Sequence, residues 1–283
     1  MIDIGANLSH DSFDHDLVDV VARANEAGLQ HIILTGTSLA SIHKALGICR
    51  SHHGFSVTAG IHPHEAAQAN QETLTEIRQL TALPEIVAIG ETGLDFNRNY
   101  SPHPDQERVF EEHLALACDL DLPVFLHQRD AHHRFLPILK SFRDELKGGG
   151  VVHCFTGSRE ELYAYLDLDM YIGLTGWICD ERRGQDLLPL IREIPANRLL
   201  LETDSPYLLP RSLKPRPKGR RNEPAMLTEV LRMVSAQTGR SCQQLAQETT
   251  ANAVDLFHLE LSHGLTPHEL SSVHPDNPQH QAR

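Results

Sequence analysis

Four short apolar runs of the sequence each lead into a histidine or a carboxylate. Glu91 follows "IVAIG", His127 follows "PVFL", His153 follows "GVV" and Asp204 follows "RLLLET". Two imidazoles and two carboxylates buried together would leave charges and hydrogen-bond donors poorly compensated, and a divalent cation removes that cost. If the fold brings these side chains together, they predict a metal site with mixed nitrogen and oxygen ligands. Such a set suits Mg²⁺, Mn²⁺ or Zn²⁺.

The elements that must position these residues are eight apolar runs rich in β-branched residues. They are residues 2–6, 31–36, 55–61, 86–91, 123–127, 150–154, 170–176 and 198–203. Near-continuous apolar strands that alternate with helices indicate a parallel sheet covered on both faces. We therefore predict an α/β fold, a (β/α)8 TIM barrel. A doubly wound open sheet is the alternative, because strand count alone does not show that a sheet closes.

Segments with helical periodicity lie between and after these strands. The clearest are residues 16–28, 105–120, 224–238 and 242–257. We expect a single barrel domain over residues 1–258. Residues 259–283 are polar and show little periodicity, so we expect them to form a mostly disordered tail.

Further polar residues follow the predicted strands. In a barrel enzyme the active site lies at the carboxyl ends of the strands, so each of these residues is a candidate. His62 and His64 follow the third strand, and Arg129 follows the fifth. Asp95 and Glu202 lie close in sequence to predicted ligands and are candidates to support them, with a purely structural role as the alternative.

A basic run follows the eighth strand. The segment "RSLKPRPKGRR" at 211–221 includes Arg220 and Arg221, in a chain whose net charge is −13. A charge run is usually a solvated surface, but a cationic loop at the rim of a metal site is better explained as a phosphate binder. The negative net charge argues against a protein that coats nucleic acid through bulk electrostatics. It does not exclude a nuclease, which depends on the local charge of its site. Several aromatic residues near strand exits could stack a base, although packing is their commoner role: Trp177, Tyr207, Phe96 and Phe155.

The cysteine content and the N-terminus bear on the compartment. The five cysteines are odd in number and widely spaced, which favours the reduced thiols of a cytosolic protein. No apolar run approaches the roughly 20 residues that span a membrane, and no secretory signal begins the chain. We expect a cytoplasmic monomer without a membrane or an obligate protein partner.

Longer motifs make the sequence resemble a known family. The segments "GIHPH", "AIGETGLDFNR", "VFLHQRDAH", "VVHCFTGS", "YIGLTGW", "LLLETDSPYLLP" and "RRNEPA" resemble, in this order, those of the TatD family of metal-dependent deoxyribonucleases. The resemblance covers residues 1 to about 258. It implies an amidohydrolase-type TIM barrel that hydrolyses phosphodiesters. It also implies 3′→5′ exonuclease activity on single-stranded DNA or RNA, with Mg²⁺ or another divalent ion.

The resemblance also implies roles for single residues. Glu91 resembles the carboxylate that holds or bridges the metals, and His127 and His153 resemble two imidazole ligands of one metal. Asp204 resembles the ligand and general base beside the attacking water. The residues expected to hold the substrate are His62, His64, Arg129, Arg220 and Arg221.

One departure from the family lies at the first strand exit. Most members carry D-x-H-x-H there, and the aligned residues are Asp3, Gly5 and Asn7, so both histidines are absent. We therefore expect one well-formed metal site in place of a symmetric two-metal clamp. Any second ion should be held loosely, which suits Mg²⁺ best.

The resulting hypothesis is phosphodiester hydrolysis by a metal-activated water, with Asp204 as general base. Two alternatives stay open. The same centre could hydrolyse an ester or amide, such as an aminoacyl-tRNA ester. A non-catalytic binding protein would be consistent with the missing histidines.

Overall fold

The computed structural model describes residues 1–215, 217–261 and 264–267. In this part of the chain eight parallel strands form one sheet, in the order β1-β2-β4-β5-β6-β7-β8-β9. The strands are β1 (Ile2–Ala6), β2 (His31–Leu34), β4 (Phe55–Ala59), β5 (Ile86–Asp95), β6 (Val124–Arg129), β7 (Gly150–Val152), β8 (Tyr171–Leu174) and β9 (Leu199–Leu201). Each strand therefore pairs with its neighbours in chain order, whereas a doubly wound sheet reverses that order.

Hydrogen bonds between the segment after β9 and β1 close the sheet. Ala6 forms a parallel bridge with Ser205, and the Asn7 amide donates to the Ser205 carbonyl at 2.7 Å. The Asp204 amide donates to the Gly5 carbonyl at 2.8 Å. The predicted TIM barrel is confirmed, and the open-sheet alternative is wrong because the last strand returns to the first.

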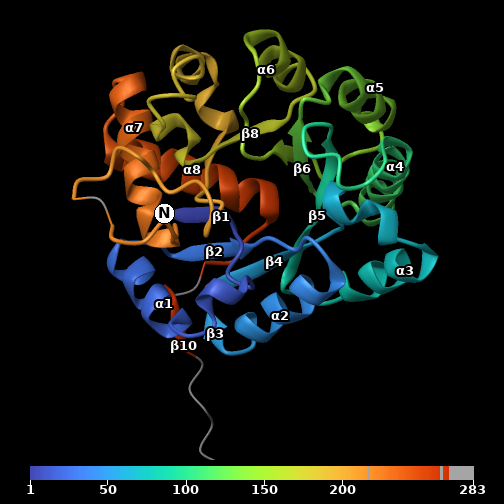
Figure 1. Cartoon of the computed structure of the whole chain (residues 1–283), viewed down its shortest axis with the longest axis horizontal. Helices are drawn as coiled ribbons and strands as arrows, with labels where there is room; N and C mark the ends of the chain where they lie inside the picture. The colour runs from blue at the N-terminus through green and yellow to red at the C-terminus, as the bar shows by residue number, and fades with distance from the viewer. Residues whose placement is uncertain (216, 262–263, 268–283) are drawn as a thin grey trace, which may run out of the picture.

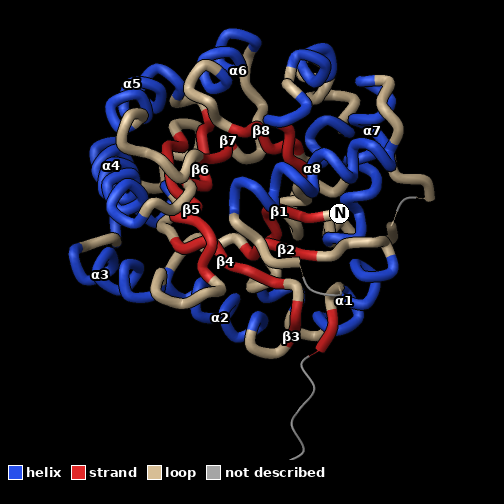
Figure 2. Tube along the Cα trace, turned by 180° about the vertical axis from the view of Figure 1, so that it is seen from behind, coloured by secondary structure: helices blue, strands red, loops and turns tan. Residues whose placement is uncertain are grey.

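Helices surround the barrel, as Figures 1 and 2 show. They are α1 (Leu17–Glu26), α2 (Leu39–Cys49), α3 (Gln71–Leu80), α4 (His103–Leu120), α5 (His132–Phe142), α6 (Arg159–Leu166), α7 (Leu227–Thr238) and α8 (Cys242–Phe257). Local side chains set their limits: the Asn70 side chain accepts from the amides of Glu72 and Thr73 at the start of α3, and Gly239 ends α7 with φ +73°.

The barrel has an inner core and an outer one. The inner core holds inward-facing residues such as Ile4, Phe125 and Leu200, and the outer core lies between the strands and the helices. Helix α8 adds Phe257 to the inner core, and Asn252 on the same helix donates to carbonyl oxygens next to and at the start of β9. The amino ends of the strands are therefore covered by α8, which leaves the carboxyl ends as the open mouth.

Two strand limits differ from the prediction in a way that matters for the site. Strand β5 continues to Asp95, four residues beyond the predicted end, because its ladder with β6 extends to the pair Asp95 and Arg129. Glu91 therefore lies inside a strand, at the register shift between Gly90 and Thr92. Strand β7 ends at Val152, so His153 is the first residue beyond it.

The predicted tail, residues 259–283, lies largely outside the described residues. Within its described part, Leu259 and Leu265 are buried. A short strand, β10 (Thr266–Pro267), pairs antiparallel with β3 (His52–His53). The segment just after the barrel domain is thus held to its surface.

Candidate active site

A cavity of about 690 Å³ opens at the carboxyl ends of the strands. Its walls hold the predicted ligands and the two histidines after β4. These lining residues are Glu91, His127, His153, Asp204, His62 and His64. The topology thus brings together side chains that are spread over more than 140 positions of the sequence.

Glu91 is the centre of this group. Its Oε1 lies 2.7 Å from His153 Nε2, 2.8 Å from His127 Nδ1 and 3.4 Å from His62 Nε2. The Nε2 of His153 also lies 3.4 Å from His127 Nδ1. Three imidazoles from different strand exits therefore converge on one buried carboxylate oxygen.

The group meets the requirements of a divalent cation. Ligand atoms of His62, Glu91 and His127 all lie within 4.8 Å of one another. Buried His127 Nε2 makes no hydrogen bond, although Asp95 Oδ2 lies 3.5 Å away. Nitrogen and carboxylate oxygen at this spacing are the donors that Zn²⁺ and Mn²⁺ prefer and that Mg²⁺ accepts together with water. The residues present fit a metal.

Neighbouring groups fix which nitrogen of two rings faces the cavity. His153 Nδ1 lies 3.3 Å from Glu202 Oε2, so the other nitrogen, Nε2, faces Glu91. His62 Nδ1 accepts the His64 amide at 3.1 Å, which leaves Nε2 as the nitrogen of His62 that faces Glu91. A carboxylate behind a ligand histidine fixes the tautomer and raises the basicity of the ring.

Glu202 lies in a space that two glycines leave free. A Cβ at Gly5 would meet Glu202 Oε2 at 2.5 Å, and a Cβ at Gly173 would meet Glu202 Oε1 at 2.4 Å. The fully buried carboxylate also accepts the Cys154 amide at 2.5 Å. The missing side chain at Gly5 therefore leaves room for the carboxylate behind His153.

Asp204 faces the same cavity from the β1 and β9 side. Its Oδ1 accepts the Asn7 side-chain amide at 3.0 Å, so Asn7 acts as a donor to Asp204. Burial raises the pKa of Asp204 to about 7, and the nearby carboxylates add to this effect. The backbone of Asp204 is left-handed, with φ +53°, a conformation that is uncommon outside glycine.

The charges of the Glu91 group are mutually dependent. Burial alone would raise the pKa of Glu91, but the neighbouring imidazolium charges and hydrogen bonds outweigh it and hold this pKa well below its usual value. Burial opposes protonation of His153, but Glu91 and Glu202 raise the pKa of His153 well above its usual value. Glu91 also raises the pKa of His62, but burial has the larger effect and lowers this pKa to about 4.

The structure places the predicted substrate-binding arginines differently. Arg129 lines the cavity. Arg221 binds Asp16 with two hydrogen bonds, at 2.7 and 2.6 Å, and covers the ring of Phe13. Arg220 is exposed, and neither Arg220 nor Arg221 is among the described residues that line the cavity.

Several further lining residues were not singled out from the sequence, among them Arg98, Tyr100 and Arg183. Arg98 ends the segment "AIGETGLDFNR" and Arg183 lies in "ICDERRG" at 178–184, but a single arginine in a loop carries no signal of its direction. Among the aromatic residues considered, Trp177 and Tyr207 line the cavity, whereas Phe155 is buried and Phe96 stacks on His103.

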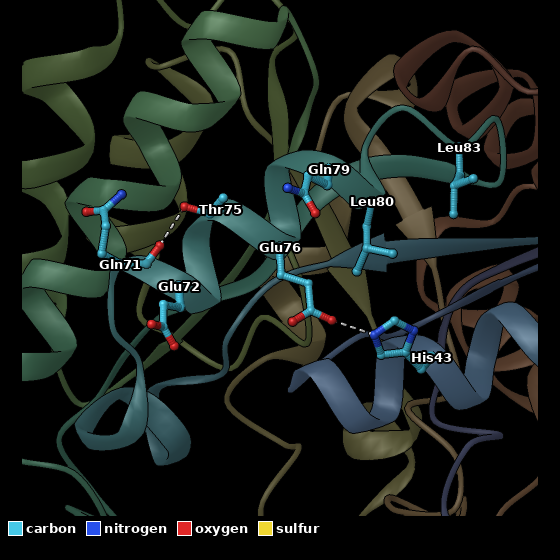
Figure 3. A pocket seen from close by; sticks show the side chains of 8 residues that line it. All are labelled: His43, Gln71, Glu72, Thr75, Glu76, Gln79, Leu80 and Leu83. Carbon is cyan, nitrogen blue, oxygen red and sulfur yellow. Dashed lines mark hydrogen bonds and ion pairs between the residues drawn. The ribbon is translucent and has the colours of Figure 1, made fainter.

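A second hollow, of about 570 Å³, lies outside the barrel between α2 and α3 (Figure 3). Glu76 on α3 points toward His43 on α2, and the two side chains lie 2.7 Å apart. This pair is exposed and its members satisfy each other, so the hollow lacks the converging buried donors of the barrel mouth. We therefore place the candidate active site at the barrel mouth. None of the described helices combines the length and apolar character needed to cross a membrane.

Comparison with known proteins places the chain among nucleases. The family model described as TatD related DNase matches residues 2–258. The 3′-5′ ssDNA/RNA exonuclease TatD of Cronobacter sakazakii is 50% identical over 257 residues, which are 91% of this chain and 97% of that protein. The protein of the same name from Escherichia coli K12 is 49% identical, over 91% of this chain and 98% of its own length.

A solved structure agrees with the fold. The TatD homologue YJJV of Escherichia coli K12 superposes with a TM-score of 0.82 at 27% identity. The match covers 92% of this chain and 98% of that one. The barrel described above is therefore shared over nearly the whole length of both proteins.

Proposed function

Because the chain belongs to the TatD family of DNases, we propose that it is a 3′-5′ exonuclease acting on single-stranded DNA and RNA. The assignment makes it a hydrolase of nucleic-acid ester bonds. The observation that carries the proposal is the convergence of His62, His127 and His153 on Glu91 Oε1 in the barrel mouth. Relatives at about 50% identity that are named as exonucleases supply the substrate class.

We propose that Glu91, His127, His153 and Asp204 hold the divalent ion, which we expect to be Mg²⁺. When bound, such an ion acidifies a water and polarises a phosphoryl oxygen. Asn7 occupies Oδ1 of Asp204, which leaves Oδ2 to take the proton from the water. A carboxylate oxygen beside the bound water can serve as the general base for that step.

Other side chains of the mouth would hold the substrate. His62 Nε2 can donate to a phosphate oxygen, because its Nδ1 is occupied by the His64 amide. His64 is tied to Asp95 at 2.7 Å through Nε2, so its Nδ1 is the nitrogen left to face the substrate. Arg129 adds a positive charge to the same wall, and cations there would neutralise charge that builds on the phosphate in the transition state.

The dimensions of the mouth favour a single strand. A cavity of about 690 Å³ is in the range of pockets that enclose one small ligand, so a duplex would have to open before a phosphodiester reached the base of the mouth. The arginines of the wall favour a nucleic-acid substrate over a small neutral ester. The intact ligand set argues against a non-catalytic protein. On the grounds given by the sequence, we also propose a cytoplasmic monomer.

The test is a time course on end-labelled single-stranded DNA with Mg²⁺. We expect the wild type to shorten the strand from its 3′ end, and His127→Ala and Asp204→Asn to lower the rate by about 10²–10⁴-fold. His15→Ala, at an exposed position, is the matched control and should keep full activity. Circular dichroism checks the fold of each variant. Wild-type rates in both site variants would refute the mechanism.

A further inference from the structure

One wall of the cavity carries an indole ring in contact with a guanidinium group. Arg183 Cζ lies 4.2 Å from the centre of the Trp177 ring, and Arg129 Cζ lies 5.9 Å from it. All three residues line the cavity that contains Glu91. A π surface and cations are therefore present within the same cavity as the metal-ligand group.

The backbone and a buried carboxylate hold this arrangement in place. Trp177 lies in the 3-10 helix η3 (Gly176–Cys179), whose cap Thr175 accepts the Trp177 amide at 3.2 Å. Arg183 Nε donates to Asp180 Oδ2 at 3.0 Å, and Asp180 is only 2% exposed. The guanidinium of Arg183 is thus directed onto the ring by a fixed partner, so the contact is more than a chance meeting of surface side chains.

Arg129 differs from Arg183 in lacking such a partner. Within the described part of the chain its guanidinium makes no ion pair and no side-chain hydrogen bond. Arg129 lies two residues after His127 on β6, so both side chains lie on the same face of the strand. A half-buried cation with free donors, next to a metal-ligand histidine, is suited to an anionic group of the ligand.

We propose that Trp177, Arg129 and Arg183 form a subsite for one nucleotide next to the phosphodiester that is cleaved. The base stacks on the exposed part of the Trp177 ring, and Arg129 pairs with the phosphate of that nucleotide. Arg183 stacks on the indole and keeps its plane fixed. The subsite rests on the proposed function for the identity of its ligand, and it accepts any base because stacking needs only a π face.

The subsite has a direct optical reporter, because Trp177 is the one tryptophan in the sequence. The experiment titrates the Mg²⁺-loaded protein with a phosphorothioate-linked deca-thymidylate, which resists cleavage, and records tryptophan emission. Anisotropy of a labelled copy of the same strand measures binding independently. We expect emission to be quenched in proportion to the bound fraction, and an abasic strand of the same length to bind with little quenching.

Two substitutions separate the parts of the subsite. Arg129→Ala should weaken strand binding about 5- to 20-fold. It should also reduce the slope of log affinity against log salt concentration by about 1, as expected for one lost phosphate contact. Trp177→Ala should weaken it about tenfold, and Trp177→Phe, which keeps a ring, should recover part of that loss. Arg78→Ala, an exposed arginine on α3, is the control and should bind like the wild type.

The outcomes distinguish this subsite from the proposed function. Unchanged emission at saturating strand, or equal affinity of Trp177→Ala, Trp177→Phe and the wild type, would overturn the subsite and leave the nuclease assignment standing. Quenching by the strand in a protein that cleaves no oligonucleotide would support the subsite and refute the nuclease activity. Thermal unfolding checks that each variant is folded, and Trp177→Phe replaces Trp177→Ala if the latter does not fold.

Discussion

The two sides of the barrel mouth are built from different chemistry. On the side of β4 to β7, three imidazoles surround the oxygen Oε1 of Glu91. On the side of β1 and β9, Asp204 is joined by Asn7, whose amide donates to it at 3.0 Å. The first side offers nitrogen ligands with carboxylates behind them, whereas the second offers one carboxylate and a hydrogen-bond donor.

The difference between the sides has a steric origin. The volume that a side chain at position 5 would occupy is filled by Glu202, 2.5 Å from an ideal Cβ of Gly5. Glu202 in turn lies 3.3 Å from Nδ1 of His153 on the opposite side. The small residue Gly5 on one side of the mouth thus leaves room for the group that orients His153 on the other. We infer that metal affinity is concentrated on the imidazole side.

The largest expected effect compares one residue from each side. His153→Ala removes a nitrogen donor that lies 2.7 Å from Glu91, and it should weaken binding of Mn²⁺ at least about 100-fold, beyond the usual effect of an outer-shell change. Asn7→Ala removes only a donor to Asp204 and should change that affinity by less than about fivefold. Calorimetric titration of the metal-free proteins measures both. Equal losses in the two variants would mean that the sides contribute alike.

A smaller effect tests the steric origin of the asymmetry. Gly5→Ala places a methyl group against Glu202 and the ring of Phe125, so it should lower the free energy of unfolding by about 1–3 kcal/mol. Gly47→Ala is the matched control, because nothing lies within 4 Å of its Cβ and the residue sits in helix α2, where alanine is favoured. Urea unfolding compares the two. A Gly5→Ala protein as stable as Gly47→Ala would show that Glu202 moves aside freely.

Periodicity was enough to predict the barrel and the imidazole side of its mouth. Glu91 and His127 lie within buried strands and His153 directly follows one, and parallel strands bring their carboxyl ends together. Periodicity could not predict the partner of Arg221, because Asp16 lies 205 positions earlier and carries no pattern of its own. Charge density in the sequence therefore pointed to Arg220 and Arg221, which do not line the cavity, whereas Arg98 and Arg183 do. Tertiary contacts decide where the charged group of a long side chain lies.

The smallest effect concerns a histidine that supports the imidazole side from behind. His113 on α4 is fully buried, accepts the Ile61 amide through Nε2 at 3.1 Å, and donates through Nδ1 to the Val109 carbonyl at 2.8 Å. Ile61 immediately precedes His62, so this neutral ring holds the backbone that carries a site residue. Burial lowers the pKa of His113 from 6.5 to about 4.

Because the folded pKa of His113 lies below the unfolded one, its contribution to stability is fully present above pH 6.5. It is lost as the pH falls from about 6.5 toward 4, since the unfolded chain then binds a proton that the folded chain refuses. Between pH 7.5 and pH 5.5 the loss should be about 1 kcal/mol. Glutamine does not titrate, so the free energy of unfolding of His113→Gln should fall by about 1 kcal/mol less than that of the wild type between pH 7.5 and pH 5.5. Urea unfolding at the two pH values measures this. The exposed His15→Gln should lose as much as the wild type. Equal pH dependence in all three proteins would mean that protonation of His113 does not weaken the β4 exit, and that acid acts on the mouth through other groups.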